Sequence, residues 1–219
     1  HFIEDANPMP PKFPFLCLTV SGGHTMIVLV KDYFDMEIIG KTIDDAAGEA
    51  FDKIGKIMGL DYPAGPIIDK LAKLGNPDAF TFGKPKLENY DYSLSGIKTS
   101  VLYFLQKQLK ENPNFIQENV ENLCASVQKT IIDVLMKKLE KAAFDYDVKE
   151  VAIAGGVSAN SGLREAMQNN VEKLGWNVYI PKFEYTTDNA AMIGIVGYQK
   201  FLIDNFETSK VVSKARISF

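Results

Sequence analysis

Two pairs of adjacent glycines stand where apolar segments end, a position at which a ligand can approach the backbone closely. Gly22 and Gly23 follow one such segment, and Gly155 and Gly156 follow another. Because glycine has no β-carbon, its backbone N–H groups are accessible to a phosphate or carboxylate, and a flat purine or ribose can lie against the chain. Tight turns that serve only the fold are the alternative interpretation of both pairs.

The residues beside each pair indicate what such a ligand would contact. Ser21, Gly22 and Gly23 predict a nest of successive backbone N–H groups for an anion. Asn160 lies four residues after the second pair, where its side-chain amide would hydrogen-bond a sugar at a helix N-terminus. The alternative for Asn160 is the N-cap of that helix.

Three aspartates occur in patterns that admit both a binding role and a structural one. Asp52 precedes Lys56 by four residues on an expected helix, which favours an exposed ion pair. Asp69 follows Gly65 by four residues, and Gly65 is in the simpler interpretation a turn residue. Asp188 is most simply the N-cap of the last expected helix.

The composition excludes several classes of protein. Neither a His-x-x-x-His pattern nor paired cysteines occur, so the chain alone cannot build a closed metal site, and no Ser-His-Asp arrangement follows from the spacing. The net charge of −4 means that a nucleic acid would have to be bound by a local basic face. Two cysteines make no disulfide framework, which favours a reducing cytoplasm, and no apolar run approaches the length of a membrane span.

Apolar periodicity predicts three strands, then helices, then an alternation of strand and helix. The expected strands cover 13–20, 24–30, 36–43, 150–155 and 176–181, and the expected helices cover 44–60, 66–74, 95–109, 116–144, 160–175 and 189–202. Asp44 or Asp45 is expected to cap the first helix. We therefore predict an α/β fold whose mixed sheet combines an antiparallel hairpin with βα crossovers. By analogy this is the layout of one lobe of the actin, sugar-kinase and heat-shock ATPase (ASKHA) superfamily.

The first residues indicate a linker. The chain opens without methionine, on an acidic and proline-rich stretch. We therefore expect residues 1–12 to be a linker from a missing N-terminal lobe. Residues 13–219 are expected to form a C-terminal ASKHA-like lobe with a helical insertion at about 44–145.

Five sequence blocks occur together and in a fixed order. They are LTVSGGHT, DDAAGEAFDKIGKIMGLDYPAGP, YSLSGIKT, AGGVSAN and TTDNAAMIG. In this combination they resemble the tRNA N6-adenosine threonylcarbamoyltransferase family, called TsaD in bacteria, Kae in archaea and eukaryotes, and formerly Gcp or O-sialoglycoprotein endopeptidase. The resemblance runs from about Phe13 to the C-terminus, which is nearly the whole chain.

The resemblance implies a reaction and a set of site residues. The threonylcarbamoyl group of threonylcarbamoyl-AMP would pass to the N6 amine of the tRNA adenosine 3′ of the anticodon, and AMP would leave. By motif, the residues Thr19, Val20, Ser21, Gly22 and Gly23 would line the substrate near its phosphate and carbamoyl end. Asp52, Gly65 and Asp69 would contact the nucleotide sugar or its neighbourhood, and Asn160, with the preceding Gly155 and Gly156, would hold the ribose or purine side. Asp188 resembles a metal ligand of the family, and the catalytic residue that accepts the amine proton is unassigned.

The resemblance also implies a cofactor and partners. One divalent metal, Fe2+ or Zn2+, would bind each subunit through Asp188 and a His-x-x-x-His pair that this chain lacks, and Thr19 stands where archaeal members have a tyrosine ligand. The isolated 219-residue chain is therefore expected to bind metal weakly and to be inactive. The expected partners are tRNA, threonylcarbamoyl-AMP, a paralogous scaffold subunit (TsaB) and an ATPase (TsaE), in the cytoplasm and without a membrane.

Two other functions remain as alternatives. An ASKHA-fold kinase or ATPase would use the same glycine turns for ATP, and a non-catalytic scaffold paralogue would keep the fold without the activity. Because a scaffold is expected to lose Asn160 and Asp188, and both are present, the sequence favours the enzyme. The candidates for tRNA phosphate contacts are Lys53, Lys56, Lys70, Lys73, Lys84, Lys86, Lys98, Lys214 and Arg216, with solvated surface charges as the alternative.

Overall fold

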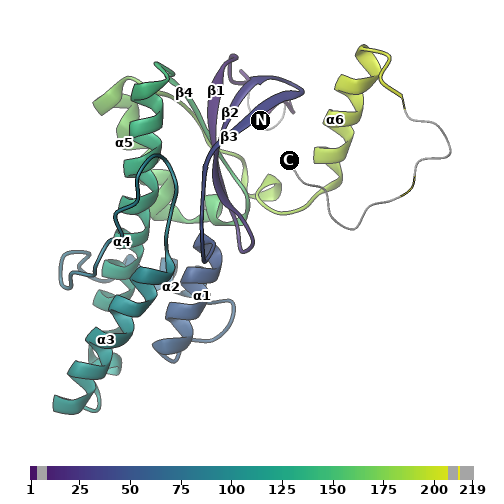
Figure 1. Cartoon of the computed structure of the whole chain (residues 1–219). Coiled ribbons are helices and arrows are strands. Elements are labelled where there is room, and N and C mark those ends of the chain that lie inside the picture. Colours follow the sequence, from purple (N-terminus) through teal and green to yellow (C-terminus); the bar gives the residue numbers. More distant parts are fainter. Residues whose placement is uncertain (4–8, 207–211, 213–219) are drawn as a thin grey trace. The chain divides into compact units, whose positions relative to one another are not determined.

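The computed structural model describes residues 1–3, 9–206 and 212, and the contacts divide the chain into two units, 1–187 and 188–219 (Figure 1). The strands of the first unit are β1 (Phe15–Val20), β2 (Thr25–Asp32), β3 (Asp35–Lys41), β4 (Glu150–Ala154) and β5 (Asn177–Tyr179). Its helices are α1 (Ala47–Ile57), α2 (Ala64–Ala72), α3 (Ser95–Glu111), α4 (Phe115–Asp145) and α5 (Ser161–Leu174), with short 3-10 helices η1 (Gly156–Ala159) and η2 (Phe183–Tyr185). The second unit contains α6 (Ala190–Leu202).

The five strands form one mixed sheet in the order β3-β2-β1-β4-β5. β2 is antiparallel to both β1 and β3, whereas β4 is parallel to both β1 and β5. Helices α1 to α4 connect β3 to β4, and α5 is the crossover between β4 and β5. The predicted α/β fold, with an antiparallel hairpin and βα crossovers, is confirmed.

Side chains that alternate along β1 divide the sheet into two faces. Leu16, Leu18 and Val20 are fully buried in the larger core, which they share with the helices. Phe15 belongs to a smaller cluster on the other face, where it packs with Val30 of β2. The helices therefore cover one face of the sheet, and Figure 1 shows α4 running from beside this sheet toward α1, α2 and α3.

The start of α1 differs from the prediction. Neither Asp44 nor Asp45 caps it; the N-cap is Ala46. The hydroxyl of Thr25, a buried residue of β2, accepts the N–H of Ala47 at 2.8 Å, and Glu49 accepts the N–H of Ala46 at 3.4 Å. Because a residue from another element supplies this cap, sequence-local capping rules miss it.

Two further boundaries depart from expectation. α2 begins at Ala64, two residues before Pro66, because Asp52 of α1 accepts N–H groups of its first turn. The glycine pair after β4 leads first into η1 and only then into α5, so the residues between the expected strand at 150–155 and the expected helix at 160–175 form a short 3-10 helix.

The second unit begins at Asp188, and its helix α6 is capped by the next residue. Asn189 is the N-cap, and its Oδ1 accepts the N–H of Met192 at 3.1 Å, so the structural interpretation of Asp188 as N-cap is wrong. Within the described part of the chain, no helix combines the length and the apolar character that crossing a membrane requires.

Candidate functional site

Two glycine turns meet at one edge of the sheet. β1 and β4 are parallel neighbours, with Thr19 paired to Ala154 at their carboxyl ends, so the turns that follow them emerge at the same edge. Gly155 has φ +87°, and a β-carbon there would lie 2.4 Å from the carbonyl oxygen of Val20. Glycine satisfies both the backbone conformation and the close approach, so this contact joins the two turns.

The start of α1 closes on the first of these turns. The N–H of Gly48 donates to the carbonyl oxygen of Ser21 at 3.0 Å. A β-carbon on Gly48 would lie 2.9 Å from the backbone nitrogen and Cα of Gly22, so a larger residue would push the helix away. η1 also contacts α1 and β1. The first turn, η1 and the start of α1 are therefore packed together.

Three glycines of this assembly border open space. No atom lies within 4 Å of a β-carbon built on Gly22, Gly23 or Gly156, and all three residues are exposed. The side of Gly155 on which a β-carbon would point, in contrast, is packed against the backbone of Val20, and the residue is half-buried. That Gly155 and Gly156 both lie against a purine or ribose stays a prediction. The most exposed backbone surface for a flat ligand is that of the other three glycines.

The predicted anion nest is reduced by hydrogen bonds within the first turn. Oγ of Ser21 accepts the N–H groups of Gly23 and His24 at 3.2 and 2.9 Å, and the N–H of Ser21 donates to the carbonyl oxygen of His24 at 2.8 Å. Of the three N–H groups in the predicted nest, that of Gly22 alone has no hydrogen-bond partner among the described residues. The turn is therefore rigidly formed, but it offers an anion one donor and not three.

The last two residues of β1 differ in what they offer a ligand. The side chain of Val20 is fully buried in the larger core, so only its backbone is available. Thr19 is half-buried on the other face, and its Oγ1 lies 3.8 Å from Sγ of Cys17. Of the two predicted contacts, Thr19 alone has a side chain outside the helical core.

Asp52 holds the start of α2. Its Oδ1 accepts the N–H of Ala64 at 2.8 Å and that of Gly65 at 3.4 Å, which satisfies two donors of the first turn. The expected ion pair with Lys56 is wrong: it does not occur among the ion pairs of the described residues. Asp52 and Gly65, both predicted as nucleotide contacts, are thus direct neighbours. Oδ2 of Asp52 makes no hydrogen bond within the described chain.

Asp69 connects α2 to the start of α5. Its Oδ1 accepts both the backbone N–H and the hydroxyl of Ser161, at 3.0 and 2.7 Å. Its Oδ2 lies 3.8 Å from Nζ of Lys73, an exposed lysine. Asp69 therefore fixes the residue that directly follows Asn160.

Asn160 is the N-cap of α5, as its structural interpretation predicts. Its Oδ1 accepts the N–H of Leu163 at 3.0 Å, and its Nδ2 donates to Oε1 of Gln128 at 2.7 Å. The role of Gln128 is not evident from any sequence motif. Its one sequence signal is that this glutamine lies on the same helical face as Cys124 and Ile131, where an amide is unusual.

Arg164 fixes η1 from α5 and is a second residue that the sequence does not reveal. Its Nε donates to the carbonyl oxygen of Ser158, and its Nη2 to that of Pro181, both at 2.8 Å. The guanidinium also lies over the ring of Phe183 at 4.1 Å. Burial lowers the pKa of Arg164 from its ordinary value. These contacts tie the glycine turn after β4 to the loop after β5.

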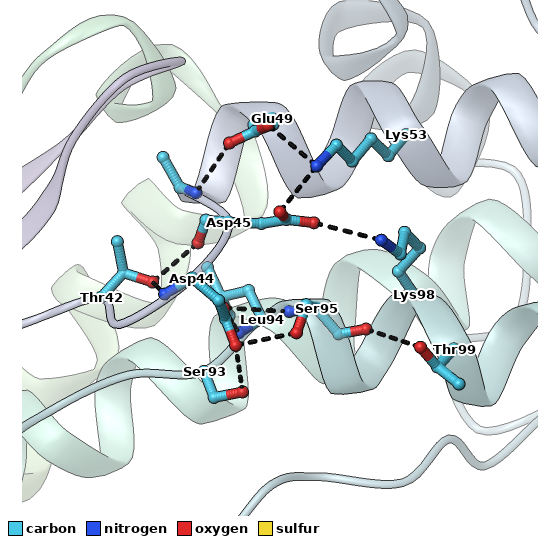
Figure 2. Close-up of polar contacts among 11 residues, drawn as sticks. Thr42, Asp44, Asp45, Glu49, Lys53, Ser93, Leu94, Ser95, Lys98 and Thr99 are labelled. Carbon is cyan, nitrogen blue, oxygen red and sulfur yellow. Dashed lines mark hydrogen bonds and ion pairs between the residues drawn. The ribbon is translucent and has the colours of Figure 1, made fainter.

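A polar network joins α1 to α3 (Figure 2). The carboxylate of Asp44 accepts the hydroxyls of Ser93 and Ser95 at 2.6 and 2.8 Å, and the N–H groups of Leu94 and Ser95 at 2.8 and 3.2 Å. Burial raises the pKa of Asp44, but these hydrogen bonds outweigh burial and lower it to about 2. Asp44, predicted to cap α1, therefore caps α3.

The next residue, Asp45, carries the charged part of the same network. It is 9% exposed; its Oδ1 lies 2.7 Å from Nζ of Lys53, and its Oδ2 lies 3.6 Å from Nζ of Lys98 (Figure 2). Lys53 also pairs with Glu49 at 2.9 Å. Two adjacent aspartates thus anchor the helix whose Gly48 packs against the first glycine turn.

Asp188, the predicted metal ligand, is an exposed residue of the second unit. The described residues contain no group of three His, Cys, Asp or Glu side chains placed to hold a metal ion. The residues present therefore do not by themselves fit a complete metal site.

Comparison with known proteins identifies relatives across nearly the whole chain. Residues 2–195 match the family model described as TsaD: tRNA N6-adenosine threonylcarbamoyltransferase. Proteins called tRNA N6-adenosine threonylcarbamoyltransferase are 74% identical in Riemerella anatipestifer and 56% identical in Christiangramia forsetii, over 99% and 100% of this chain. These matches cover 63% and 64% of the relatives, so the chain spans a little under two thirds of their length.

A solved structure and these relatives together settle the fold and the family. The crystal structure of full-length HypF in the phosphate- and nucleotide-bound form has a TM-score of 0.65 at 11% identity, over 88% of this chain and 41% of HypF. That likeness concerns the fold alone, and it agrees with the predicted ASKHA-like lobe. On the strength of the family model and the identities above, the chain belongs to the tRNA N6-adenosine threonylcarbamoyltransferase (TsaD) family.

Proposed function

We propose that the protein transfers the threonylcarbamoyl group from threonylcarbamoyl-AMP to the N6 amine of the adenosine 3′ of the anticodon in tRNA, and releases AMP. Membership of the family supports this activity. The structural observation that carries it for this chain is the edge where two glycine turns meet and leave Gly22, Gly23 and Gly156 open. A nucleotide needs such a surface, because its base and ribose lie flat against backbone.

The site residues then take distinct roles in our proposal. The segment 19–23 lines the phosphate and carbamoyl end, where the N–H of Gly22 is the donor that the turn leaves free. Asp52 and Asp69 use Oδ1 for the protein. We assign Oδ2 of each to the nucleotide sugar beside Gly65: that of Asp52 makes no hydrogen bond within the described chain, and that of Asp69 lies 3.8 Å from Nζ of Lys73. Asn160 faces the ribose or purine with its Nδ2 group, because its Oδ1 caps α5.

The chemistry requires positioning more than a reactive side chain. The N6 lone pair attacks the carbamoyl carbon, the bond from that carbon to the phosphate oxygen breaks, AMP leaves with the electron pair, and N6 releases one proton to the solvent. A rigid turn that holds the carbamoyl group near the amine lowers the entropic part of the barrier, and a backbone N–H stabilises the charge that develops on the carbonyl oxygen. No covalent enzyme intermediate is needed, which agrees with the lack of a Ser-His-Asp arrangement in the sequence.

We propose Asp188 as one ligand of a divalent ion, Fe2+ or Zn2+, in keeping with the metal dependence that is general in the family. The described residues do not supply the remaining ligands, so we assign no step of the transfer to the ion. In the full-length gene product, Asp188→Asn should lower the metal bound per subunit, measured by mass spectrometry of the purified protein. Glu165→Gln, an exposed substitution on α5, is the control. Equal metal content in both variants would remove Asp188 from the site.

The candidate lysines for tRNA binding fall into two groups, according to whether they already pair with a carboxylate of the protein. Lys53, Lys73, Lys84 and Lys98 each form an ion pair, whereas Lys56, Lys70 and Lys86 are exposed and form none among the described residues. Lys214 and Arg216 lie outside the described residues. We propose that the exposed lysines Lys56, Lys70 and Lys86 contact tRNA phosphates.

We also propose that the protein works in a cytoplasmic complex with TsaB and TsaE. The division of the chain into a linker at 1–12 and a lobe at 13–219 stays a prediction.

The activity can be tested with the full-length gene product, threonylcarbamoyl-AMP and a transcribed tRNA. The expected result is one threonylcarbamoyl group on the adenosine 3′ of the anticodon, detected by mass spectrometry, and no transfer to a tRNA with guanosine at that position. Gly156→Val should reduce the rate, because the added side chain fills the open space, whereas Gly83→Ala, at an exposed glycine, should not. Phosphate release from ATP without any tRNA product would instead favour an ATPase.

A further inference from the structure

Gln128 is a buried polar residue in the middle of α4. It is 8% exposed, and its helical neighbours Val127 and Ile131 are completely buried. Burying an amide is unfavourable unless it is hydrogen-bonded. Its Oε1 accepts the Nδ2–H of Asn160 at 2.7 Å. The hydrogen bond that compensates its burial is therefore made to the N-cap residue of α5.

The two hydrogen bonds of Asn160 fix the direction of its amide. The N–H of Leu163 can only donate, so Oδ1 must face it, and Nδ2 is then turned toward Gln128. An asparagine amide has two N–H donors and an oxygen with two lone pairs, so one N–H and one lone pair are left. No other hydrogen bond of this side chain occurs within the described residues. The remaining N–H of Asn160 is therefore held in a defined direction.

The first turn of α5 leaves room for Gln128. A β-carbon on Gly162 would lie 2.8 Å from Nε2 of Gln128 and 2.8 Å from Cδ1 of Ile132. Alanine is the better helix former by about 1 kcal/mol, so local propensity does not favour glycine here. Gly162 instead leaves the space that the Gln128 amide occupies. The glycine is therefore a second feature of α5 that favours the contact between Gln128 and Asn160.

We propose that Gln128 is a positioning residue for the nucleotide: it holds the amide of Asn160 so that the remaining Nδ2–H meets the ribose or purine of AMP. The inference rests on the proposed function, since it takes Asn160 to contact the nucleotide. Gln128 does not touch the ligand. Without its acceptor, the Nδ2 group of Asn160 loses its fixed partner, and the amide must be ordered when the nucleotide binds.

The test measures AMP affinity by calorimetry in the full-length gene product, because AMP is the leaving group of the proposed reaction. Gln128→Met has a similar volume and no acceptor, and should weaken AMP binding about three- to tenfold. Gln128→Glu keeps an acceptor for Asn160 and should restore affinity to within about twofold of the parent protein. Thr130→Val is the stability control. It removes a buried hydroxyl that donates to the carbonyl oxygen of Ser126 on the same helix, and it should lower the melting temperature without changing AMP affinity.

A double-mutant cycle separates positioning from general weakening of the fold. In an Asn160→Ala background, Gln128→Met should change AMP affinity by less than about twofold, because the residue through which it acts is gone. Gly162→Ala displaces the Gln128 amide without removing it, so it should weaken AMP binding as Gln128→Met does. It decides the question alone if Gln128→Met does not fold.

The outcomes distinguish this inference from the proposed function. If Asn160→Ala weakens AMP binding but Gln128→Met and Gly162→Ala do not, the positioning role is overturned and the nucleotide role of Asn160 stands. An equal loss from Gln128→Met in both backgrounds also overturns it. If the parent protein does not bind AMP, or Asn160→Ala binds it equally well, the nucleotide role of Asn160 and this inference both fail.

Discussion

Gly155 and Val20 are packed so closely that a β-carbon on Gly155 would lie 2.4 Å from the carbonyl oxygen of Val20. This contact joins the ends of β1 and β4, two parallel neighbours in the sheet. The adjacent Gly156 has no atom within 4 Å of the corresponding position. The two glycines of this pair therefore have different roles. Gly155 allows the ends of β1 and β4 to pack closely, and Gly156 leaves space for a ligand.

A pair of alanine substitutions tests this division. Gly155→Ala should lower the free energy of unfolding by about 2–4 kcal/mol, because the side chain meets backbone and φ is positive. Gly156→Ala should change it by less than about 1 kcal/mol, since the added methyl group enters open space. Urea unfolding of the two variants of the full-length gene product measures both. Similar losses in the two would contradict the assignment.

Acid unfolding tests the role of Asp44 at the start of α3. The pKa of Asp44 in the fold is about 2, below its ordinary value of 3.8. Its contribution is therefore complete above about pH 4 and is lost as the pH falls toward 2. Asp44→Asn should cost about 1 kcal/mol at pH 7, a figure reduced for the exposure of the carboxylate to water.

The pH dependence supplies the control for that experiment. The stability difference between the parent protein and Asp44→Asn, measured by urea unfolding, should shrink between pH 4 and pH 2. Asp61→Asn, an exposed substitution in the loop before α2 that removes no hydrogen bond within the described chain, is the control. A difference for Asp44→Asn that stays constant across this range would mean that the hydrogen bonds to α3 do not depend on the charge.

Substitutions of Asp69 separate its structural role from its proposed ligand role. Asp69→Asn keeps an oxygen to accept the N–H and hydroxyl of Ser161, so stability should fall by less than about 1 kcal/mol, whereas Asp69→Ala should cost about 2 kcal/mol. If Oδ2 contacts the ribose, both variants should bind AMP several-fold more weakly. Calorimetry that finds Asp69→Asn equal to the parent protein would restrict Asp69 to holding α5.

The type and order of the helices and strands could be predicted from the sequence because local patterns determine them. The apolar alternation of 13–20 and the helical spacing of 116–144 both correspond to observed elements. What failed were contacts made across the chain. The cap of α1 comes from Thr25, and Asp44 caps a helix that starts about 50 residues later. Rules that use only neighbouring residues cannot predict contacts between residues so far apart in the sequence.

The candidate site was predictable to a similar extent. The glycine turns stood out because glycine is unusual at the end of a buried strand, and the structure brings them together. The number of free N–H groups was wrong, because the hydroxyl of Ser21 accepts the N–H of Gly23 and the carbonyl oxygen of His24 accepts the N–H of Ser21. Gln128 was missed, because its role depends on the amide of Asn160 across the helix pair α4–α5.

The contrast between Lys84 and Lys86 tests the proposed tRNA surface. Nζ of Lys84 lies 2.6 Å from Asp133, whereas Lys86 is exposed and unpaired among the described residues. Lys86→Gln should weaken tRNA binding and reduce the slope of log K against log salt concentration by about one. Lys84→Gln should leave the slope nearly unchanged, because a carboxylate already compensates its charge. Filter-binding assays across a salt series on the full-length gene product would remove Lys86 from the surface if the two slopes agree.

The most direct test of the account is a crystal structure of the full-length gene product grown with AMP. The nucleotide should contact the exposed backbone of both Gly22 and Gly156, with its ribose or purine within hydrogen-bonding distance of Nδ2 of Asn160. A nucleotide bound away from these glycines, or an empty edge at saturating AMP, would contradict it.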